Sequence, residues 1–301
     1  MNNHSVLTIG NFDGIHLGHQ KLLVRMIEAA HSEGLQSVVL SYTVHPAFTL
    51  KAHAKPSVLC PAELKQRQLY SLGIDMVELL TFNSEFAKIS ASQFLYEYIL
   101  PVWHPKLIVM GYDSHFGFKR TGDYHFLLQH ADKNGFRVEY VEPLEYRGSP
   151  ISSSMIRELL AQGDILSANK LLGKPYRLLG EVGHGIGRGK GFGFPTANLI
   201  LSNPHQLIPR EGIYLSRVHL EGATFFGLTN IGSSPTVKHS GVVEIETYII
   251  GFTGDIYNRY MELELMRYLR EERMFRNVEE LITAMNLDLS LAESIINGGE
   301  V

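Results

Sequence analysis

The stretch Thr8-Ile-Gly-Asn-Phe-Asp-Gly-Ile-His-Leu-Gly-His19 decides how the first half of this chain folds. It begins in a short apolar run that ends at Ile9 and then passes through a glycine-rich turn toward a helix. This arrangement directs free backbone N–H groups and the positive end of the helix dipole at one point, which favours phosphate binding. His16 and His19 are three residues apart, so both imidazoles can donate to one phosphate from the same helix face.

The first half of the chain alternates strand and helix patterns. Strands are predicted at 6–9, 37–41, 74–80, 107–110 and 136–141, and helices at 22–34, 61–73, 90–100 and 123–134. We expect Pro61 at the first helical position and a helix end before Pro101. The alternation predicts an α/β domain with a Rossmann-type parallel sheet, covered on both faces, which binds ligands at the carboxyl ends of its strands.

The pattern changes after Gly173-Lys-Pro175. Two short helices, 155–161 and 166–172, precede strand-like runs at 176–182, 213–220, 223–231, 242–252 and 260–266, and residues 277–296 return to helix. Successive strands without intervening helices predict an antiparallel sheet or barrel. We therefore predict one domain over residues 1–175 and a β-barrel domain with terminal helices over residues 176–301.

Composition limits the classes of function. The 301 residues are 45% hydrophobic and 19% charged, as in a globular protein. A net charge of −4 gives no basic footprint for nucleic acid. No signal peptide is visible, and no apolar run approaches the roughly 18 to 20 residues of a membrane helix. The single cysteine agrees with a reducing compartment, so we expect a cytoplasmic protein without nucleic-acid or membrane partners.

Two further segments of the first half suit phosphate chemistry. The serines of Ile151-Ser-Ser-Ser154, followed by Arg157, offer hydroxyls, free N–H groups and a cation at a helix start, although a plain serine cap is the commoner use of such residues. The loop 111–117 follows the fourth predicted strand and would face the same cleft as the opening stretch. Its alternative interpretation is a glycine-bounded turn.

The second half has its own candidate site. Seven of the fourteen residues in 180–193 are glycine, so this loop can wrap an anion with backbone N–H groups. Thr196 and Asn198 follow, two residues apart, and would place oxygen ligands on one face of an extended chain, which suits a phosphate-bound Mg²⁺. Glu244 and Glu246 also share a strand face, and one carboxylate could accept a proton during phosphoryl transfer. A proline turn and a solvated strand face are the alternatives.

These motifs carry a family resemblance over almost the whole chain. The opening stretch resembles the H-x-G-H signature of the nucleotidylyltransferase superfamily, and I-S-S-S-M-I-R (151–157) resembles its I-S-S-T-x-x-R motif. Further matches are G-F-P-T-A-N (193–198), E-G-I-Y (211–214), N-I-G-S-S-P-T (230–236), E-I-E-T-Y (244–248), G-D-I-Y (254–257) and L-R-E-E-R-M-F (269–275). Together they resemble the prokaryotic bifunctional riboflavin kinase/FMN adenylyltransferase family, also called FAD synthetase.

The resemblance implies two ATP-dependent reactions. The barrel would phosphorylate riboflavin to FMN, with Thr196 and Asn198 holding Mg²⁺ and the nucleotide phosphates and Glu246 as general base. The other implied kinase residues are Gly185, Lys190, Gly193, Pro195, Arg270 and Phe275. The first domain would adenylylate FMN to FAD and release pyrophosphate, with His16, His19 and Arg157 in the catalytic role. The implied ATP-binding residues are Gly10, Asn11, Phe12, Gly14, His16, His19, Asp113, Ser153, Ser154 and Arg157.

Two loops of the first domain depart from the family pattern. Where the family reads F-D-P-H-P, this chain has Tyr42-Thr-Val-His-Pro46, so Thr43 replaces a carboxylate. Where the family reads G-x-[ND]-F-x-F-G, Ser114 replaces an aromatic residue. The wall that faces flavin or adenine therefore differs. A chain with only one of the two activities, or a non-catalytic flavin- or nucleotide-binding regulator, stays open beside the bifunctional enzyme.

Overall fold

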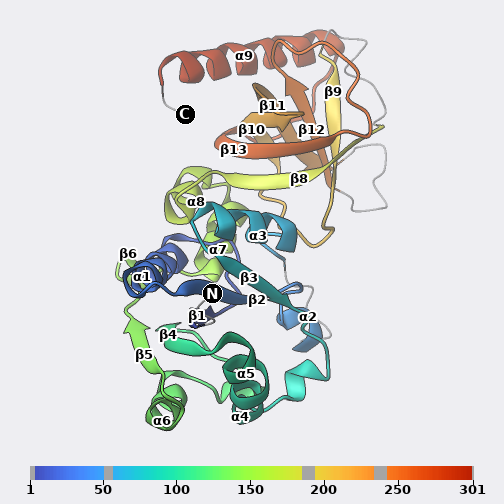
Figure 1. Ribbon diagram of the computed structural model, residues 1–301. Helices are drawn as coiled ribbons and strands as arrows, with labels where there is room; N and C mark the ends of the chain where they lie inside the picture. The colour runs from blue at the N-terminus through green and yellow to red at the C-terminus, as the bar shows by residue number, and fades with distance from the viewer. Residues whose placement is uncertain (1–3, 51–56, 185–193, 234–242, 300–301) are drawn as a thin grey trace. The chain divides into compact units, whose positions relative to one another are not determined.

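The computed structural model describes residues 4–50, 57–184, 194–233 and 243–299. The chain divides into two compact units, Met1–Ser153 and Ser154–Val301. Figure 1 colours the first from blue to green and the second from green to red.

The first unit is built on a five-stranded parallel sheet. Its strands are β1 (Ser5–Ile9), β2 (Gln36–Tyr42), β3 (Met76–Leu80), β4 (Pro105–Gly111) and β5 (Arg137–Val141), in the order β3-β2-β1-β4-β5. All four pairings are parallel, so the predicted sheet is confirmed. The strand order reverses between β1 and β4. Their carboxyl ends therefore form the crevice at which open α/β sheets bind ligands.

Helices cover both faces of this sheet. They are α1 (Leu17–Glu33), α2 (Ala47–Leu50), α3 (Ala62–Ser71), α4 (Ala91–Gln93), the π-helix η2 (Phe94–Ile99), α5 (Leu100–Trp103) and α6 (Tyr124–Asn134). Alternate residues of a strand point to opposite faces. Thus Val6 packs in the core cluster with α1 and α3, whereas Leu7 and Ile9 pack in the cluster with η2 and α6.

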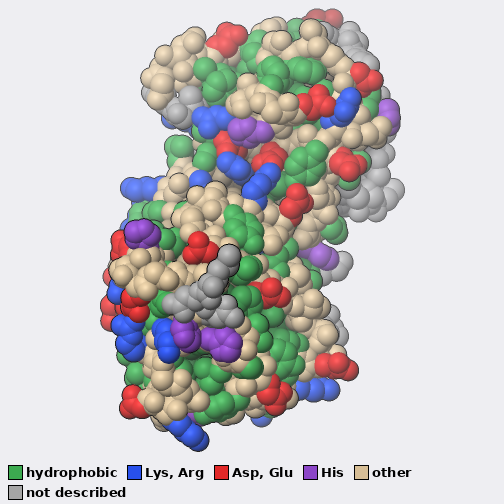
Figure 2. Space-filling view, viewed as in Figure 1, with side chains coloured by type: hydrophobic (Ala, Val, Ile, Leu, Met, Phe, Trp, Pro, Cys, Tyr) green, Lys and Arg blue, Asp and Glu red, His purple; other side chains and the backbone are tan. Residues whose placement is uncertain are grey.

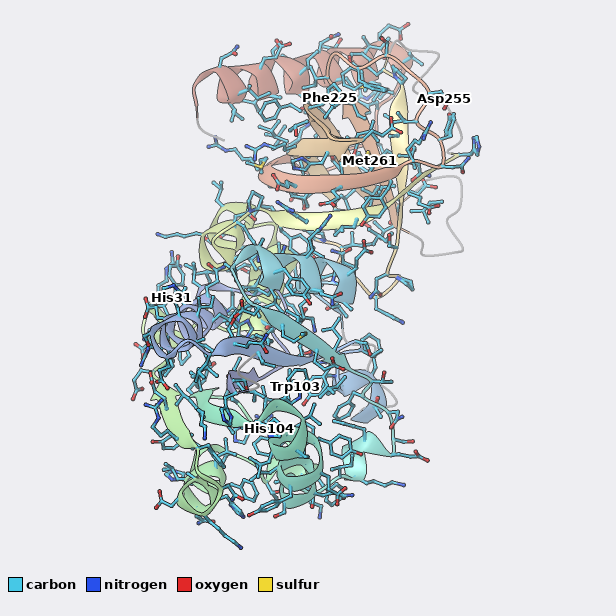
Figure 3. All side chains as sticks on the ribbon, in the orientation of Figure 1. His31, Trp103, His104, Phe225, Asp255 and Met261 are labelled. Carbon is cyan, nitrogen blue, oxygen red and sulfur yellow. The ribbon has the colours of Figure 1, made fainter. Side chains whose placement is uncertain are left out.

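Two predicted helix boundaries were wrong. Pro61 caps α3 instead of occupying its first helical position. The helix expected to stop before Pro101 continues through α5 to Trp103. The preceding π-helix explains this, because its wider turn accommodates a proline that lacks the N–H of a regular ladder. The helix ends at Trp103, because the next residue, His104, adopts a left-handed conformation with φ 42°. Figure 3 labels both side chains. The short elements η1 (Phe86–Lys88), η3 (Phe118–Arg120), β6 (Glu145–Tyr146) and β7 (Ser149–Pro150) were not predicted.

The second unit is a closed six-stranded barrel with flanking helices. Its elements are α7 (Ser153–Gln162), α8 (Ile165–Leu172), β8 (Tyr176–Gly183), β9 (Thr196–Leu201), β10 (Gly212–Leu220), β11 (Ala223–Ser233), β12 (Val243–Ile249), β13 (Tyr260–Arg270) and α9 (Val278–Asn297). Neighbouring strands pair antiparallel in the closed order β10-β11-β12-β9-β8-β13, which confirms the predicted barrel. Strand β9, absent from the predicted set, joins β12 to β8.

The flanking helices pack against the outer face of the barrel. Ala292 and Ile295 of α9 contact Leu215 and Leu228 in one apolar cluster. On α8, the amide of Asn169 donates to the Leu265 carbonyl and accepts from the Tyr176 N–H, at 2.8 Å in both cases. Side-chain hydrogen bonds therefore tie α8 to β13 and β8.

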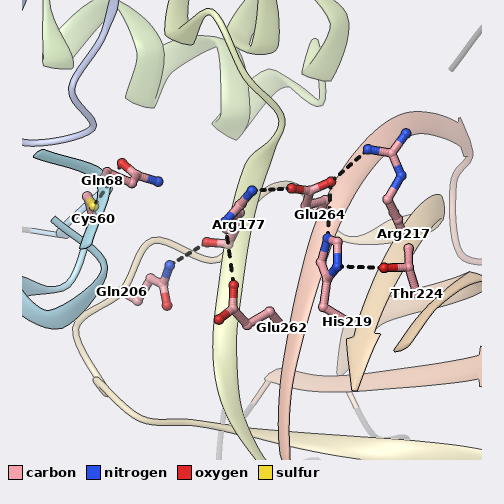
Figure 4. A network of polar contacts seen from close by, with 9 residues as sticks. All are labelled: Cys60, Gln68, Arg177, Gln206, Arg217, His219, Thr224, Glu262 and Glu264. Carbon is pink, nitrogen blue, oxygen red and sulfur yellow. Dashed lines mark hydrogen bonds and ion pairs between the residues drawn. The ribbon is translucent and has the colours of Figure 1, made fainter. Parts of the chain in front are cut away.

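A buried carboxylate organises another part of this outer face (Figure 4). Glu264 on β13 is only 3% exposed. Its oxygens lie 2.5 Å from Arg177 Nη2, 3.0 Å from Arg217 Nη1 and 3.4 Å from His219 Nε2. Arg177 also lies 3.6 Å from Glu262. These contacts connect β8, β13 and β10 through charged side chains.

The surface shows mixed charge. On the face drawn in Figure 2, acidic and basic side chains are interspersed, in keeping with the net charge of −4. Among the described residues, no helix is both long enough and apolar enough to cross a membrane.

Candidate active sites

The loop that leaves β1 has an uncommon backbone conformation. The φ angles of Phe12, Gly14 and Ile15 are 49°, 84° and 44°. Positive φ is rare outside glycine and least favourable for a β-branched residue such as Ile15. Phe12 and Ile15 are 3% and 0% exposed, so packing against the core stabilises this conformation. Backbone strain of this kind concentrates at ligand-binding sites.

His16 and His19 meet at the start of α1. His16 is the N-cap, and its Nδ1 accepts a hydrogen bond of 3.3 Å from the His19 N–H. The two rings stack with centroids 3.6 Å apart and planes inclined by 15°. Because Nδ1 of His16 accepts, the proton of the neutral ring lies on Nε2, which remains a donor. The structure thus brings together the two imidazoles that the sequence predicted to act on one phosphate group.

Glycines leave room for these rings. A Cβ on Gly10 would lie 2.9 Å from the Phe12 ring, and a Cβ on Gly18 would lie 3.2 Å from the His16 ring. The Phe12 ring in turn contacts His19 edge to face, with centroids 5.2 Å apart. The glycines of the motif therefore shape the site through side-chain packing as well as through backbone freedom.

A buried lysine, which the sequence interpretation missed, holds the same loop. Lys65 of α3 is 4% exposed. Its Nζ donates to the Asn11 carbonyl at 2.9 Å, the Tyr42 carbonyl at 2.9 Å and Ser41 Oγ at 3.1 Å. The sequence does indicate a buried lysine here, because Lys65 lies between Leu64 and Leu69 on the apolar side of a helix. A charged residue there needs oxygen partners.

Asp13 supplies the charge opposite to Lys65. Its carboxylate accepts from the Leu59 N–H at 3.0 Å and the Cys60 N–H at 2.9 Å, just before α3. Burial lowers the pKa of the Lys65 ammonium group, and the nearby Asp13 carboxylate and Cys60 oppose that shift. The Lys65 ammonium group thus anchors the loop to α3, and the Asp13 carboxylate anchors it to the segment just before α3.

The two loops that depart from the family pattern follow β2 and β4, and their substituted residues are Thr43 and Ser114. Ser114 Oγ accepts from the Gly111 N–H at 3.1 Å and so caps the end of β4. Asp113 is exposed, and its carbonyl accepts from His115 Nδ1 at 2.8 Å. In the loop after β2, His45 Nδ1 accepts from the Ala47 N–H at 3.1 Å, and Thr43 is exposed. Both loops leave the sheet at the edge that carries His16.

The serine–arginine motif spans the boundary between the units. Ser153 ends the first unit, and its Oγ donates to the Asp13 carbonyl at 2.9 Å. Ser154 and Arg157 follow on α7, in the second unit. The Ser153 hydroxyl therefore supports the loop that carries the histidines.

The kinase candidates lie on the outer face of the barrel. Glu246 of β12 lies directly opposite Asn198 of β9 and, on its other side, opposite Asn230 of β11. Directly opposed residues share a face with Cβ atoms roughly 5 Å apart. The hydroxyl of Thr247, the next residue, lies 2.9 Å from that of Thr229 and is fully buried, so it faces the interior. The strand register therefore brings Glu246 beside Asn198, and Glu244 shares its face as predicted.

The remaining predicted kinase residues are distributed around this row. Thr196 lies on the same face as Asn198, opposite Tyr248, and Pro195 is exposed just before β9. Arg270 Nε and Nη2 bind the Asp288 carboxylate of α9 at 2.8 and 2.6 Å.

The segment after β13 reaches the same row of side chains. Glu272 accepts from Asn230 Nδ2 at 3.2 Å, and a Cβ on Gly232 would lie only 2.3 Å from its carboxylate. Phe275 lies under the Arg273 guanidinium, 5.1 Å from the ring centroid. The sequence interpretation quoted motifs that contain Asn230 and Glu272 but named neither as a site residue. Gly185, Lys190 and Gly193 fall outside the described residues.

Comparison with known proteins identifies the family of each half of the chain. A family model for FAD synthetase matches residues 1–155, and one for riboflavin kinase matches residues 172–296. The chain belongs to the bifunctional riboflavin kinase/FMN adenylyltransferase family. The predicted family and enzyme class are confirmed, and both modules of this family are present in the one chain.

Individual relatives support the assignment over nearly the whole of this chain. A bifunctional riboflavin kinase/FMN adenylyltransferase of Pseudomonas fluorescens is 36% identical and covers 96% of this chain and 92% of its own. One of Listeria monocytogenes is 35% identical, with 95% and 90% covered. A crystal structure from Streptococcus pneumoniae, titled as a macrolide-efflux protein, superimposes with a TM-score of 0.88 at 29% identity and covers 97% of this chain and 95% of its own.

Proposed function

We propose that residues 176–301 phosphorylate riboflavin to FMN and that residues 1–175 convert FMN to FAD, each with ATP. The observation that carries this proposal is the presence of two separate phosphate-handling arrangements in one chain. One is the stacked His16 and His19 at the N-terminus of α1, and the other is the pairing of Asn198 with Glu246 on the barrel.

In the adenylyltransferase the protein supplies position and charge. The FMN phosphate oxygen attacks the α-phosphorus of ATP, the α–β phosphoanhydride bond breaks, and pyrophosphate leaves. The Nε2–H donor of His16, the imidazole of His19 and the amides at the start of α1 stabilise the charge that develops on the phosphate oxygens. Ser153 supports this loop through the Asp13 carbonyl, and Ser154 and Arg157 stay predictions of the serine–arginine motif. No protein nucleophile is required.

In the kinase the oxygen of the ribityl 5′-hydroxyl bonds to the γ-phosphorus of ATP, the bond to the β-phosphate oxygen breaks, and ADP leaves. Glu246 accepts the proton of that hydroxyl. The oxygens of Thr196 and Asn198 share one strand face and suit a hard cation such as Mg²⁺, which neutralises phosphate charge when bound. In the described part of the chain, no group of three or more His, Cys, Asp or Glu side chains could hold a metal.

The substrates are small molecules: riboflavin, FMN and ATP. We place both reactions in the cytoplasm, because the single cysteine, Cys60, is a buried free thiol.

The test is to incubate the protein with riboflavin, ATP and Mg²⁺ and to separate the flavins by chromatography. We expect FMN to appear first and FAD to follow. FMN alone would restrict the protein to the kinase, and FAD formed only from supplied FMN would restrict it to the adenylyltransferase. Tight flavin binding without either product would replace the enzyme with a binding protein.

A further inference from the structure

Side chains from elsewhere in the first unit hold three alternate carbonyls of the loop after β1. We call Lys65, Ser41, Ser153 and Gln20 the carbonyl clamp. Its contacts are Lys65 Nζ to Asn11 O at 2.9 Å, Ser41 Oγ to Asn11 O at 3.1 Å, Ser153 Oγ to Asp13 O at 2.9 Å and Gln20 Nε2 to Ile15 O at 2.8 Å. The clamp therefore fixes the peptide planes after residues 11, 13 and 15.

Fixing a carbonyl also fixes the next amide. A trans peptide is planar, and its C=O and N–H point in opposite directions. No peptide bond of the described residues is cis. With the Asn11 carbonyl turned toward Lys65, the Phe12 N–H points away from it, and the same geometry applies to Gly14 and His16. Among the described residues, neither the Phe12 N–H nor the Gly14 N–H meets an acceptor.

Burying the Lys65 ammonium group costs free energy unless all of its donors find partners. Its three N–H donors meet three oxygens, those of Asn11, Ser41 and Tyr42, and Asp13 supplies a nearby negative charge. Removing one member of such a buried arrangement leaves the others without their partner, which is costly. The Lys65 donors therefore fix the positions of the Asn11 and Tyr42 carbonyls and, with them, the conformation of the loop after β1.

We propose that Lys65 and Gln20 are positioning residues of the adenylyltransferase, which hold the loop on both sides of Gly14 so that the Phe12 and Gly14 amides face the ATP phosphates. The inference rests on the proposed function of the first unit. Donors fixed before the substrate arrives need no reorganisation when charge develops, which is where such preorganisation increases the rate. Lys65 and Gln20 contact only the loop backbone, and in this proposal the loop amides contact the phosphates.

The test compares Lys65→Met with Lys21→Met in the full chain. Lys21 lies on α1 and donates to the Glu142 carbonyl, away from the clamp, so it controls for loss of a lysine. For Lys65→Met we expect the KM for ATP in FMN adenylylation to rise about 10- to 100-fold, because small misplacements of binding groups have effects of that size. The KM for FMN and the riboflavin kinase rate should match those of Lys21→Met.

A second variant covers the chance that Lys65→Met fails to fold. Gln20→Met leaves the buried charge intact and frees only the Ile15 carbonyl, so we expect a smaller rise of about 3- to 10-fold. Binding of inorganic tripolyphosphate, measured by calorimetry, should weaken in both variants, whereas adenosine binding should not.

The outcomes separate the two proposals. If the wild-type protein forms no FAD, the proposed function fails, and the tripolyphosphate measurement still decides the clamp. If tripolyphosphate and ATP bind to both clamp variants as they bind to Lys21→Met, or if adenosine and FMN binding weaken equally with them, the clamp has no positioning role.

Discussion

The two sites of this chain are built by opposite means. The proposed adenylyltransferase site consists mainly of backbone groups and histidines from one continuous stretch, residues 10–19, whose conformation depends on distant side chains such as Lys65. The proposed kinase site consists of side chains from three strands that the barrel register places in one row. The first site should therefore be sensitive to residues that never touch substrate, and the second to direct substitution.

Their buried charges differ in the same way. In the first unit the buried cation Lys65 is surrounded by carbonyl and hydroxyl oxygens and holds a loop. In the second unit the buried anion Glu264 is surrounded by two guanidinium groups and an imidazole and connects strands (Figure 4). One charge shapes a binding loop, and the other stabilises the scaffold.

The largest effect should come from Glu246→Gln, with Glu244→Gln as the matched control on the same strand face. Loss of a general base lowers phosphoryl-transfer rates about 10²- to 10⁴-fold. We expect riboflavin phosphorylation to fall by that amount in Glu246→Gln alone, while both variants convert supplied FMN to FAD at the wild-type rate. If the two activities of Glu246→Gln decline together, the division of chemistry between the sites is wrong.

The next effect separates two roles of His16. Its Nδ1 caps α1, and its Nε2 is the proposed donor to phosphate. In His16→Asn, asparagine is a strong N-cap, so the helix start should remain while the second donor is lost. We expect adenylyl transfer to fall about 10²- to 10³-fold, as when an oxyanion donor is removed, with unchanged thermal stability.

His16→Ala is the companion variant. It removes the N-cap as well as the donor. Its unfolding free energy should therefore lie about 1 kcal/mol below that of His16→Asn. Equal activity in His16→Asn and the wild type would remove His16 from the phosphate site. Kinase activity, measured on riboflavin, should not change in either variant.

The sequence predicted the contiguous parts of both sites and missed what only folding brings together. The predicted histidines, the parallel sheet and the barrel are all observed because their signals lie within short stretches. Lys65 was missed because its partners, Asn11 and Tyr42, are more than twenty residues away along the chain. The alignment of Asn230 with Glu246 depends on strand register, which periodicity does not specify.

A stability change should follow from Glu264→Gln. Removing the charge from Glu264 leaves Arg177 and Arg217 close together without their anion, and breaking such a buried arrangement costs about 3 kcal/mol. Addition of riboflavin and ATP should raise the midpoint of the thermal unfolding transition of the second unit. We expect Glu264→Gln to lower the midpoint of that same transition. Glu221→Gln is the control, because its partner Arg259 is exposed and the pair, at 3.0 Å, should contribute about 0.5 kcal/mol or less. Equal midpoints for the two variants would contradict a scaffold role for Glu264.

The smallest effect concerns alkaline pH and again contrasts the units. Burial raises the pKa of Tyr42 to about 12. Burial, followed by the neighbouring Tyr268, also raises the pKa of Tyr214 despite the opposing Arg210 guanidinium. The unfolded chain releases these protons near pH 10, whereas the native chain keeps them. Above pH 10 the native state therefore binds more protons than the unfolded state, so stability is complete below pH 10 and is lost as pH rises toward 12.

Phenylalanine substitutions test this contribution. In Tyr42→Phe the loss of about 1 kcal/mol per pH unit above pH 10 should disappear from the first unit, with little change at pH 7, because its ring packs edge to face on Phe82 and Phe86. Tyr214→Phe should flatten the same dependence in the second unit but also lower stability at pH 7 by about 1 kcal/mol, since the Tyr214 hydroxyl donates to the Arg210 carbonyl. Urea unfolding at pH 7, 10 and 11 measures both effects. A slope above pH 10 that is the same in Tyr42→Phe and the wild type would show that another group titrates there.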